Sequence, residues 1–230
     1  MLNAFEDLRI AVLCSRRAPG LDALLRHPHR GSLYDIACVI TTEELFAERQ
    51  RVEAAGVSVL TRPMLRRKLE DRPEYDGATA DTLRSLGVNA VVLLWYLYIL
   101  TEPILAAFPV RIVNVHDSDL TLRRPDGRRR YRGLHSTRDA IIAGEAETRS
   151  SVHLVTAGLD SGPVLALSEA YPVAPFAHQA VADGQLDIVR AYAFAHREWM
   201  IRNSWGPLLV RTIENFACGR LQAEELVSSQ

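Results

Sequence analysis

Short apolar runs alternate with helix-like segments through the first half of the chain. The runs are rich in β-branched residues, which is typical of strands that are buried on both faces of a parallel sheet. We expect strands at residues 8–14, 36–41, 57–60, 90–94 and 111–115. Helical spacing predicts helices at residues 21–26, 43–55 and 75–86, and a brief one that begins at Pro103. This order predicts an α/β fold with a Rossmann-like, mostly parallel sheet flanked by helices.

The second half departs from this alternation. A long polar segment at residues 117–134 carries six arginines between positions 123 and 132. Further elements are predicted after it: a helix capped by Ser136 that runs to Ala143, strands at 151–156 and 164–173 at the far edge of the sheet, and helices at 185–202 and 207–217. We therefore expect a single domain over residues 1–230, with its core at 8–173 and a helical C-terminal extension at 174–230.

The composition is that of an ordinary globular domain. Hydrophobic residues make up 48% of the chain, and the formal net charge of -1 argues against nucleic acid as an obligatory partner, so a small-molecule ligand fits better. The chain begins unlike a signal peptide and has no run of about 18 apolar residues that could cross a membrane. Cys14, Cys38 and Cys218 lie among apolar residues without metal-ligand spacing, which predicts buried reduced thiols, no metal site and a cytoplasmic protein.

Polar side chains follow two of the predicted strands. Asn114 and His116 lie in IVNVHDSDL, and His153 and Asp160 lie in SSVHLVTAGLDSGPV. In open α/β sheets the ligand binds beyond the carboxyl ends of the strands, where these residues could converge. An amide and an imidazolium can stabilise an oxyanion while a carboxylate helps to remove a proton from an attacking amine, so the set suits acyl transfer. Singly, each residue also has a structural explanation, such as a turn or a strand end.

Three segments carry a resemblance to a known family. NVHDSDL, GLHSTRDAIIAGE and SSVHLVTAGLDSGPV resemble the formyltransferases typified by phosphoribosylglycinamide formyltransferase, which show N-(I/V)-H-x-S-L-L-P, G-(L/I)-H and S-V-H-x-V-x-x-x-(L/V/M)-D-x-G-P. The similarity extends from the first strand to about Val173. It implies the formyltransferase fold, 10-formyltetrahydrofolate as co-substrate, a small amine as acceptor, and a chain that could form a homodimer.

The resemblance also implies roles for single residues. Asn114 and His116 would polarise the formyl carbonyl, Asp160 would assist proton transfer, and His153 would support them. The folate would lie against the segment after the fourth strand and the loop before the aspartate. The candidates for this pocket are Tyr96, Leu97, Tyr98, Ile99, Leu100, Val155, Thr156 and Gly158. For WYLYIL, packing in the core is the alternative.

The chain departs from the family pattern where the acceptor binds. The family's Gly/Ser/Asn-rich phosphate loop after the first strand is replaced by SRRAPGL, in which Pro19 lacks a backbone donor. An aspartate stands where the family usually has proline after the catalytic histidine. The substrate-binding candidates are Arg16, Arg17, Gly20 and Asp117. The arginines at 123–132 either close over a phosphate or carboxylate or form a solvated loop.

Several functions remain open on this evidence. The first is transfer of a formyl group to a small anionic amine, such as glycinamide ribonucleotide or a sugar- or nucleotide-linked amine. A hydrolase would use the same residues with water as the nucleophile. A non-catalytic folate- or nucleotide-binding protein on the same fold is the alternative of a different class. A dinucleotide-dependent oxidoreductase is disfavoured because no G-x-G-x-x-G follows the first strand.

Overall fold

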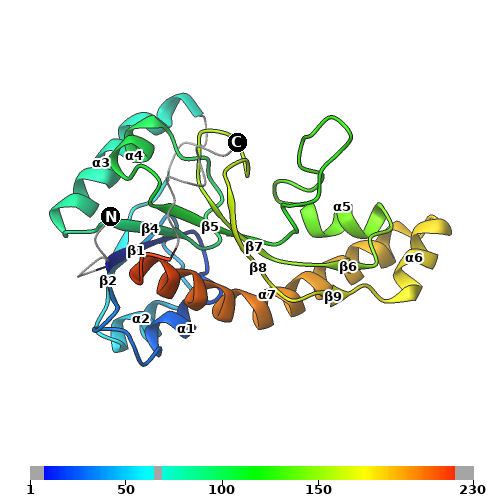
Figure 1. Ribbon diagram of the computed structural model, residues 1–230, viewed down its shortest axis with the longest axis horizontal. Coiled ribbons are helices and arrows are strands. Elements are labelled where there is room, and N and C mark those ends of the chain that lie inside the picture. The colour runs from blue at the N-terminus through cyan, green and yellow to red at the C-terminus, as the bar shows by residue number, and fades with distance from the viewer. Residues whose placement is uncertain (1–7, 65–68, 221–230) are drawn as a thin grey trace.

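A seven-stranded sheet is the centre of the described part of the chain. The computed structural model describes residues 8–64 and 69–220 (Figure 1). Its strands lie in the order β3-β2-β1-β4-β5-β7-β8, with the first five parallel and the last two antiparallel. They span β1 Leu8–Cys14, β2 Tyr34–Thr41, β3 Ser58–Thr61, β4 Ala90–Leu93, β5 Ile112–His116, β7 Ser151–Leu154 and β8 Val164–Leu167. The expected mostly parallel sheet is confirmed.

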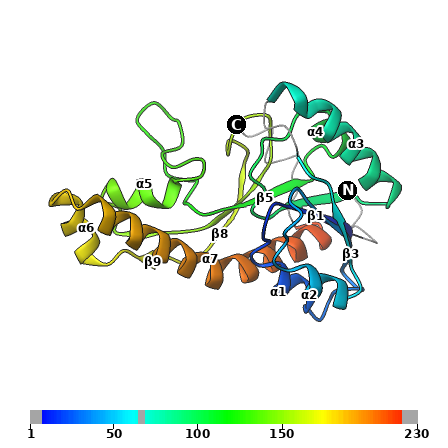
Figure 2. The same ribbon diagram turned by 180° about the vertical axis from the view of Figure 1, so that it is seen from behind.

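Helices cover both faces of the sheet (Figures 1 and 2). One face is covered by α1 Leu21–Leu25, α2 Arg49–Ala54 and the C-terminal half of α7 Leu186–Ala217. The other face is covered by α3 Arg72–Ser85 and α4 Glu102–Ala107. The 3-10 turn η1 Leu69–Asp71 precedes α3. Beside the sheet, the N-terminal half of α7 lies with α5 Ser136–Ile142, α6 Pro175–Ala182 and the small sheet of β6 Glu147–Thr148 and β9 Tyr171–Pro172.

The central strands β1 and β4 are mostly apolar because both of their faces are buried. Ile10 and Val12 of β1 point to the core beneath α7, whereas Ala11 and Leu13 point to the core beneath α3 and α4. All four side chains are at most 1% exposed. A strand with helices on both sides has no solvent face, so its sequence does not alternate.

The second predicted helix is shorter than expected. It begins at Arg49 rather than at residue 43. The preceding segment bonds to the loop after β1 instead: the Ala47 amide donates to the Arg16 carbonyl at 2.9 Å, and the Glu48 carboxylate accepts from the Ala18 amide at 3.1 Å. These long-range hydrogen bonds replace the first turn of the predicted helix.

The last predicted strand is divided. Residues 164–173 form two strands, and β9 pairs with β6 in a separate sheet. The division falls at Ser168, whose hydroxyl donates to the Glu169 carbonyl at 2.7 Å and accepts from the Ser150 amide at 2.9 Å. Helix α6, which follows, was not predicted; Pro175 stands in its first turn.

The two predicted C-terminal helices are one continuous helix of 32 residues. Pro207 lies inside α7 and removes one intrahelical hydrogen bond, but Trp205, Leu208 and Leu209 around it are buried in the core and hold the helix together. Beside the proline, Gly206 lets the helix approach α1, since a Cβ there would lie 3.0 Å from the Cβ of Ala23.

Other expectations have mixed outcomes. Cys14 and Cys38 are buried free thiols, but Cys218 is exposed because it follows the last residue of α7. No helix of the described residues is long and apolar enough to cross a membrane. The predicted single domain stays a prediction, and its ends at 1–7 and 221–230 lie outside the described residues.

Candidate active site

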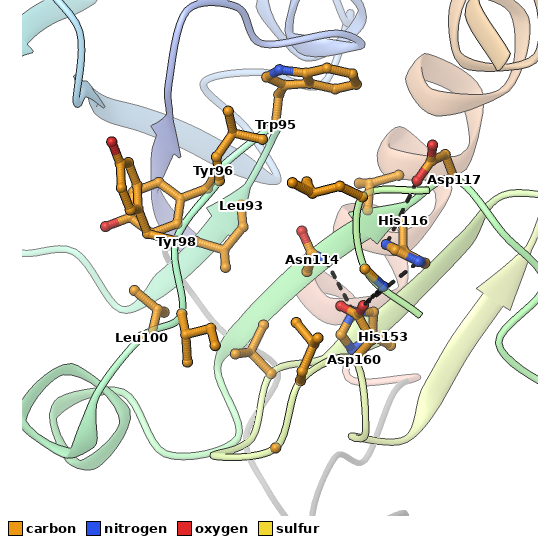
Figure 3. Close-up of a pocket in the computed structure, with 18 of the residues that line it drawn as sticks. Leu93, Trp95, Tyr96, Tyr98, Leu100, Asn114, His116, Asp117, His153 and Asp160 are labelled. Atoms are coloured by element: carbon orange, nitrogen blue, oxygen red, sulfur yellow. Dashed lines mark hydrogen bonds and ion pairs between the residues drawn. The ribbon is translucent and has the colours of Figure 1, made fainter. Parts of the chain in front are cut away.

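Strand pairing places the polar residues of two strands on one side of the sheet. Asn114 and His116 are two positions apart in β5, so both point to the same side, and His153 in β7 lies directly opposite Asn114 in the antiparallel register. Val113 and Val115, which alternate with them along β5, point to the other side and are buried in the core. Figure 3 shows the three polar side chains at the edge of one cavity.

Hydrogen bonds define the state of His153. Its Nδ1 lies 2.8 Å from the Leu154 carbonyl and can only donate there, so Nε2 is the acceptor for the Asn114 amide at 3.1 Å. Burial, together with the neighbouring charge that His116 can carry, lowers the pKa of His153 to about 4. His153 is therefore neutral near pH 7, and the amide of Asn114 keeps a second N–H for a ligand.

Asp160 faces both histidines. Its Oδ2 lies 3.7 Å from Nε2 of His116, and its Oδ1 lies 3.7 Å from Nε2 of His153. The amide of Gly133 donates to Oδ2 at 2.8 Å. The backbone of Asp160 is left-handed, with φ of 46°, a conformation that aspartate tolerates better than most residues. The loop thus turns the carboxylate back towards the end of β5.

A buried arginine holds the loop that carries Asp160. Arg129 is 6% exposed and donates to the carbonyl oxygens of Asp160 and Gly162 at 2.7 and 2.5 Å. Burial lowers the pKa of Arg129. This residue is therefore neither a phosphate clamp nor a solvated loop residue, which were the two functions expected for the arginine segment.

The other arginines of the segment lie on a hairpin-like loop that projects above α5 (Figure 1). Arg130 pairs with Glu145 at 2.5 Å, and the backbone of Arg123 bridges to that of Arg129. The remaining side chains are exposed: Arg123, Arg124, Arg128 and Arg132. The solvated-loop interpretation therefore fits these four.

Asp117 connects the end of β5 to two helices. Its side chain is buried, accepts from the Ser136 hydroxyl at 3.2 Å and forms an ion pair with Arg197 of α7. The Thr137 hydroxyl donates to its backbone carbonyl at 2.7 Å. The expected cap at Ser136 is wrong, because His135 occupies the cap position and the Ser136 hydroxyl is used on Asp117. His116 lies beside this group, with Nδ1 3.8 Å from Oδ1 of Asp117.

One cavity of about 430 Å³ brings most of the expected residues together. It is lined by the three expected catalytic residues Asn114, His116 and Asp160, and by His153 and Asp117. Every expected folate-pocket residue also lines it: Tyr96, Leu97, Tyr98, Ile99, Leu100, Val155, Thr156 and Gly158. The lining residues that were not expected include Trp95, Leu134, His135 and Arg197. Leu134 and His135 belong to the GLH segment, so the resemblance could have indicated them. Arg197 lies eighty positions from its partner Asp117, so no short sequence pattern around it indicates that it lines the cavity.

Trp95 closes the cavity between two arginines. Its ring lies 3.8 Å from the guanidinium of Arg17 and 4.3 Å from that of Arg197. Its backbone is left-handed, with φ of 55°, which is unusual for a bulky residue and common near binding sites. Arg17 also pairs with both carboxylate oxygens of Glu198, at 2.7 and 2.6 Å, and this arginine lowers the pKa of Glu198.

Three expected substrate-binding residues do not line the cavity. Arg16 is exposed, and Arg17 is engaged with Trp95 and Glu198. Gly20, with φ of 85°, lies against α7, where a Cβ would come 3.0 Å from the backbone nitrogen of Gly206. Its left-handed backbone and this close approach give the glycine a structural reason.

The cavity has the polarity that a formyl-folate requires. Nε2 of His116 is buried without a hydrogen-bond partner, and Asn114 keeps a free N–H, so two donors are available for a carbonyl oxygen. The segments around Tyr96 to Leu100 and Val155 supply apolar walls for a flat ring. Among the described residues, no group of three His, Cys, Asp or Glu could hold a metal ion.

The sequence of the chain matches a known protein family. The sequence pattern of the family described as formyl transferase matches residues 8–182, well over half of the chain. The chain belongs to the formyl transferase family. This membership confirms the expected family and its enzyme class, with formyl-tetrahydrofolate as the donor that the family uses.

Individual relatives agree with the family match. This chain is 32% identical over 168 residues to phosphoribosylglycinamide formyltransferase of Haemophilus influenzae. The similarity covers 73% of this chain and 74% of the relative. The crystal structure of glycinamide ribonucleotide transformylase 1 from Symbiobacterium toebii has a TM-score of 0.70 and 30% identity, and the likeness covers 94% of this chain and 91% of that one. The expected formyltransferase fold is confirmed.

Other relatives are much longer proteins. The formyl transferase is 29% identical over 170 residues to the trifunctional purine biosynthetic protein adenosine-3 of Drosophila melanogaster. It spans 12% of that protein's length.

Proposed function

We propose that this formyl transferase moves the formyl group of 10-formyltetrahydrofolate to the primary amine of a small anionic acceptor. The observation that carries the proposal is the convergence of Asn114, His116 and Asp160 in one cavity, with Nε2 of His116 buried, without a hydrogen-bond partner and 3.7 Å from the Asp160 carboxylate. Folate lies against Tyr96 to Leu100 and Val155 to Gly158 in this proposal, because these segments form the apolar side of the cavity.

The catalytic groups act on the formyl carbonyl and on the amine. Asn114 and His116 donate to the carbonyl oxygen and stabilise the negative charge that develops there as the amine nitrogen bonds to the formyl carbon. Asp160 helps to take the proton that the amine loses. The bond from the formyl carbon to N10 of the folate then breaks, N10 takes up a proton, and the products are a formamide and tetrahydrofolate.

His153 and Asp117 position these groups. The neutral imidazole of His153 orients the Asn114 amide, and Asp117 flanks the His116 ring on the side opposite Asp160. A water molecule in the place of the amine would make the same site a hydrolase.

The test is the release of tetrahydrofolate from 10-formyltetrahydrofolate, followed by absorbance with a panel of amines and without an acceptor. The panel contains glycinamide ribonucleotide and sugar- and nucleotide-linked amines. Wild type is compared with Asp160→Asn, which keeps the size of the side chain. Release that depends on one amine and falls about 10²- to 10⁴-fold in the variant supports the transferase.

Two other outcomes contradict the proposal in different ways. Release at the same rate with and without every amine would identify a hydrolase. Folate binding without release under any condition would identify a binding protein. The homodimer and the cytoplasmic location stay predictions; the buried free thiols of Cys14 and Cys38 are in keeping with the latter.

A further inference from the structure

A second hollow adjoins the catalytic cavity. It is a groove of about 190 Å³ between α5 and the N-terminal half of α7. Leu134, His135 and Arg197 line both the groove and the catalytic cavity, so the two spaces are continuous. The mechanism proposed above uses only the catalytic cavity and leaves this groove without a role.

The groove has a positive and partly apolar lining. Arg138, Arg190 and Arg197 contribute three guanidinium groups, and no aspartate or glutamate is among the residues that line it. Phe194 and Leu134 also line it and are 67% and 59% exposed. Large apolar side chains that stay exposed next to a catalytic cavity indicate a binding surface.

Two of these guanidinium groups, those of Arg138 and Arg190, are available to a ligand, whereas Arg197 is paired with Asp117. Arg190 pairs with Asp187 at 3.2 Å, and Arg138 pairs with the adjacent Asp139 at 3.0 Å. Both are exposed pairs between close neighbours on one helix, which contribute little and exchange readily for a better partner. An oxyanion that accepts from an arginine fork is such a partner.

The loop after β1 offers an anion less, because Arg16 is its one exposed arginine. Glu198 neutralises Arg17, and the Glu48 carboxylate occupies the amide of Ala18. Pro19 has no N–H to offer. An anionic group placed there would meet two carboxylates, whereas the groove between α5 and α7 would offer it arginines.

We propose that the groove between α5 and α7 binds the far end of the acceptor amine, a phosphate or carboxylate joined to an apolar group. The inference rests on the proposed function, because the acceptor's amino group must reach His116 and Asp160. The oxyanion lies on Arg138 and Arg190, and the apolar part lies on Phe194. Continuity through Leu134 and His135 lets one elongated molecule occupy both spaces.

The groove can be tested without any catalysis. Phenyl phosphate and phenylacetate carry an apolar ring with a phosphate or a carboxylate, and their binding to the full chain is measured by ligand-observed NMR. The double variant Arg138→Gln/Arg190→Gln is expected to bind the preferred probe about tenfold more weakly than wild type. Phe194→Ser should weaken both probes. The control Arg26→Gln/Arg51→Gln removes two exposed arginines that pair with Asp22 and do not line the groove, and it should bind as wild type does.

The two probes also identify the anion. A preference for phenyl phosphate indicates a phosphorylated acceptor, and a preference for phenylacetate indicates an acceptor with a carboxylate. If wild type binds neither probe, or if the groove variants bind both as wild type does, the inference is wrong.

A kinetic comparison separates this inference from the proposed function. With an active acceptor, the groove variant should raise KM about tenfold and leave kcat and acceptor-free release unchanged. If wild type and the groove variant formylate an amine with equal kcat/KM, the transferase proposal holds and the inference about the groove is wrong. Probe binding that depends on Arg138 and Arg190, without formylation of any amine, would keep the groove as an anion site and reject the transferase.

Discussion

Arg129 and Asp160 are joined through the backbone rather than through their charges. The guanidinium of Arg129 donates to the carbonyl oxygen of Asp160 at 2.7 Å, while the Asp160 carboxylate is left to accept from Gly133 and to face His116. The arginine therefore fixes the position of the carboxylate without neutralising it. This arrangement assigns a buried structural role to one residue of an otherwise exposed arginine segment.

Replacing Arg129 should reduce catalysis more than folate binding. Arg129→Met leaves the carbonyl oxygens of Asp160 and Gly162 without their donor, so we expect kcat to fall about 10²-fold through displacement of the carboxylate. The Kd for a folate should change much less. Arg128→Met, on the exposed part of the same loop, is the control and should behave as wild type. Equal kcat values for both variants would contradict the assignment.

Asn114 should act in the transition state. Asn114→Ala removes one donor to the carbonyl oxygen and the partner of His153, so we expect kcat to fall about 10²- to 10³-fold with a small change in KM. Steady-state kinetics with saturating folate measures both constants. A variant that only raised KM would mean that Asn114 binds the ground state as well as it binds the transition state.

His153 should make stability depend on pH. Its pKa of about 4 in the folded chain lies below the ordinary 6.5, so between these values the unfolded chain binds a proton that the folded chain does not. This contribution to stability is present above pH 6.5 and is lost as the pH falls towards 4. The difference between the two pKa values corresponds to at most about 3 kcal/mol in the free energy of unfolding.

Urea unfolding at several pH values measures this effect. His153→Asn keeps a donor for the Leu154 carbonyl but cannot take up the proton, so its stability should vary less between pH 6.5 and 4 than that of wild type. If the free energy of unfolding falls equally with pH in the two proteins, another group causes the loss of stability in acid.

Gly162 should tolerate no side chain. A Cβ there would lie 2.0 Å from the carbonyl oxygen of Leu154, a backbone atom of β7, so Gly162→Ala should destabilise the fold by about 3 kcal/mol or more. Gly127→Ala has no atom within 4 Å of its new Cβ and should cost only the strain of its φ of 79°, about 1 kcal/mol. Thermal unfolding of both variants would reveal equal shifts in Tm if this explanation is wrong.

The three thiols should react at different rates. Burial raises the pKa of Cys14, and it raises that of Cys38 to about 11, so few thiolates form at these positions near pH 8. Cys218 is exposed, and we expect a thiol reagent to label it first in the native protein. Mass spectrometry with and without denaturant counts the labels; rapid labelling of three thiols in the native chain would contradict the structure.

Local sequence was sufficient where local physics decides the structure. The continuous apolar runs predicted the parallel strands because burial on both faces removes alternation, and the ends of the predicted strands indicated that Asn114, His116 and Asp160 could converge. The polar residues after the strands already included Asp160, and the resemblance added the folate segments; these residues line the cavity.

Long-range contacts limited the prediction elsewhere. Segment 43–48 has helical spacing, yet its hydrogen bonds to the loop after β1 prevent the helix. Pro207 ordinarily ends a helix, yet packing keeps α7 intact. Arg129 and Arg197 obtain their partners from segments more than thirty positions away, and no pattern within a short window identifies such partners.

The continuity of α7 couples its two halves in rotation. Trp205, Leu208 and Leu209 fix one half beneath the sheet, and Arg190, Phe194 and Arg197 belong to the other. One residue added between these halves would turn the outer half by about 100° and shift it by about 1.5 Å. Related chains whose α7 differs by one or two residues in this interval would therefore present a different helix face beside the cavity, while their catalytic residues remain the same.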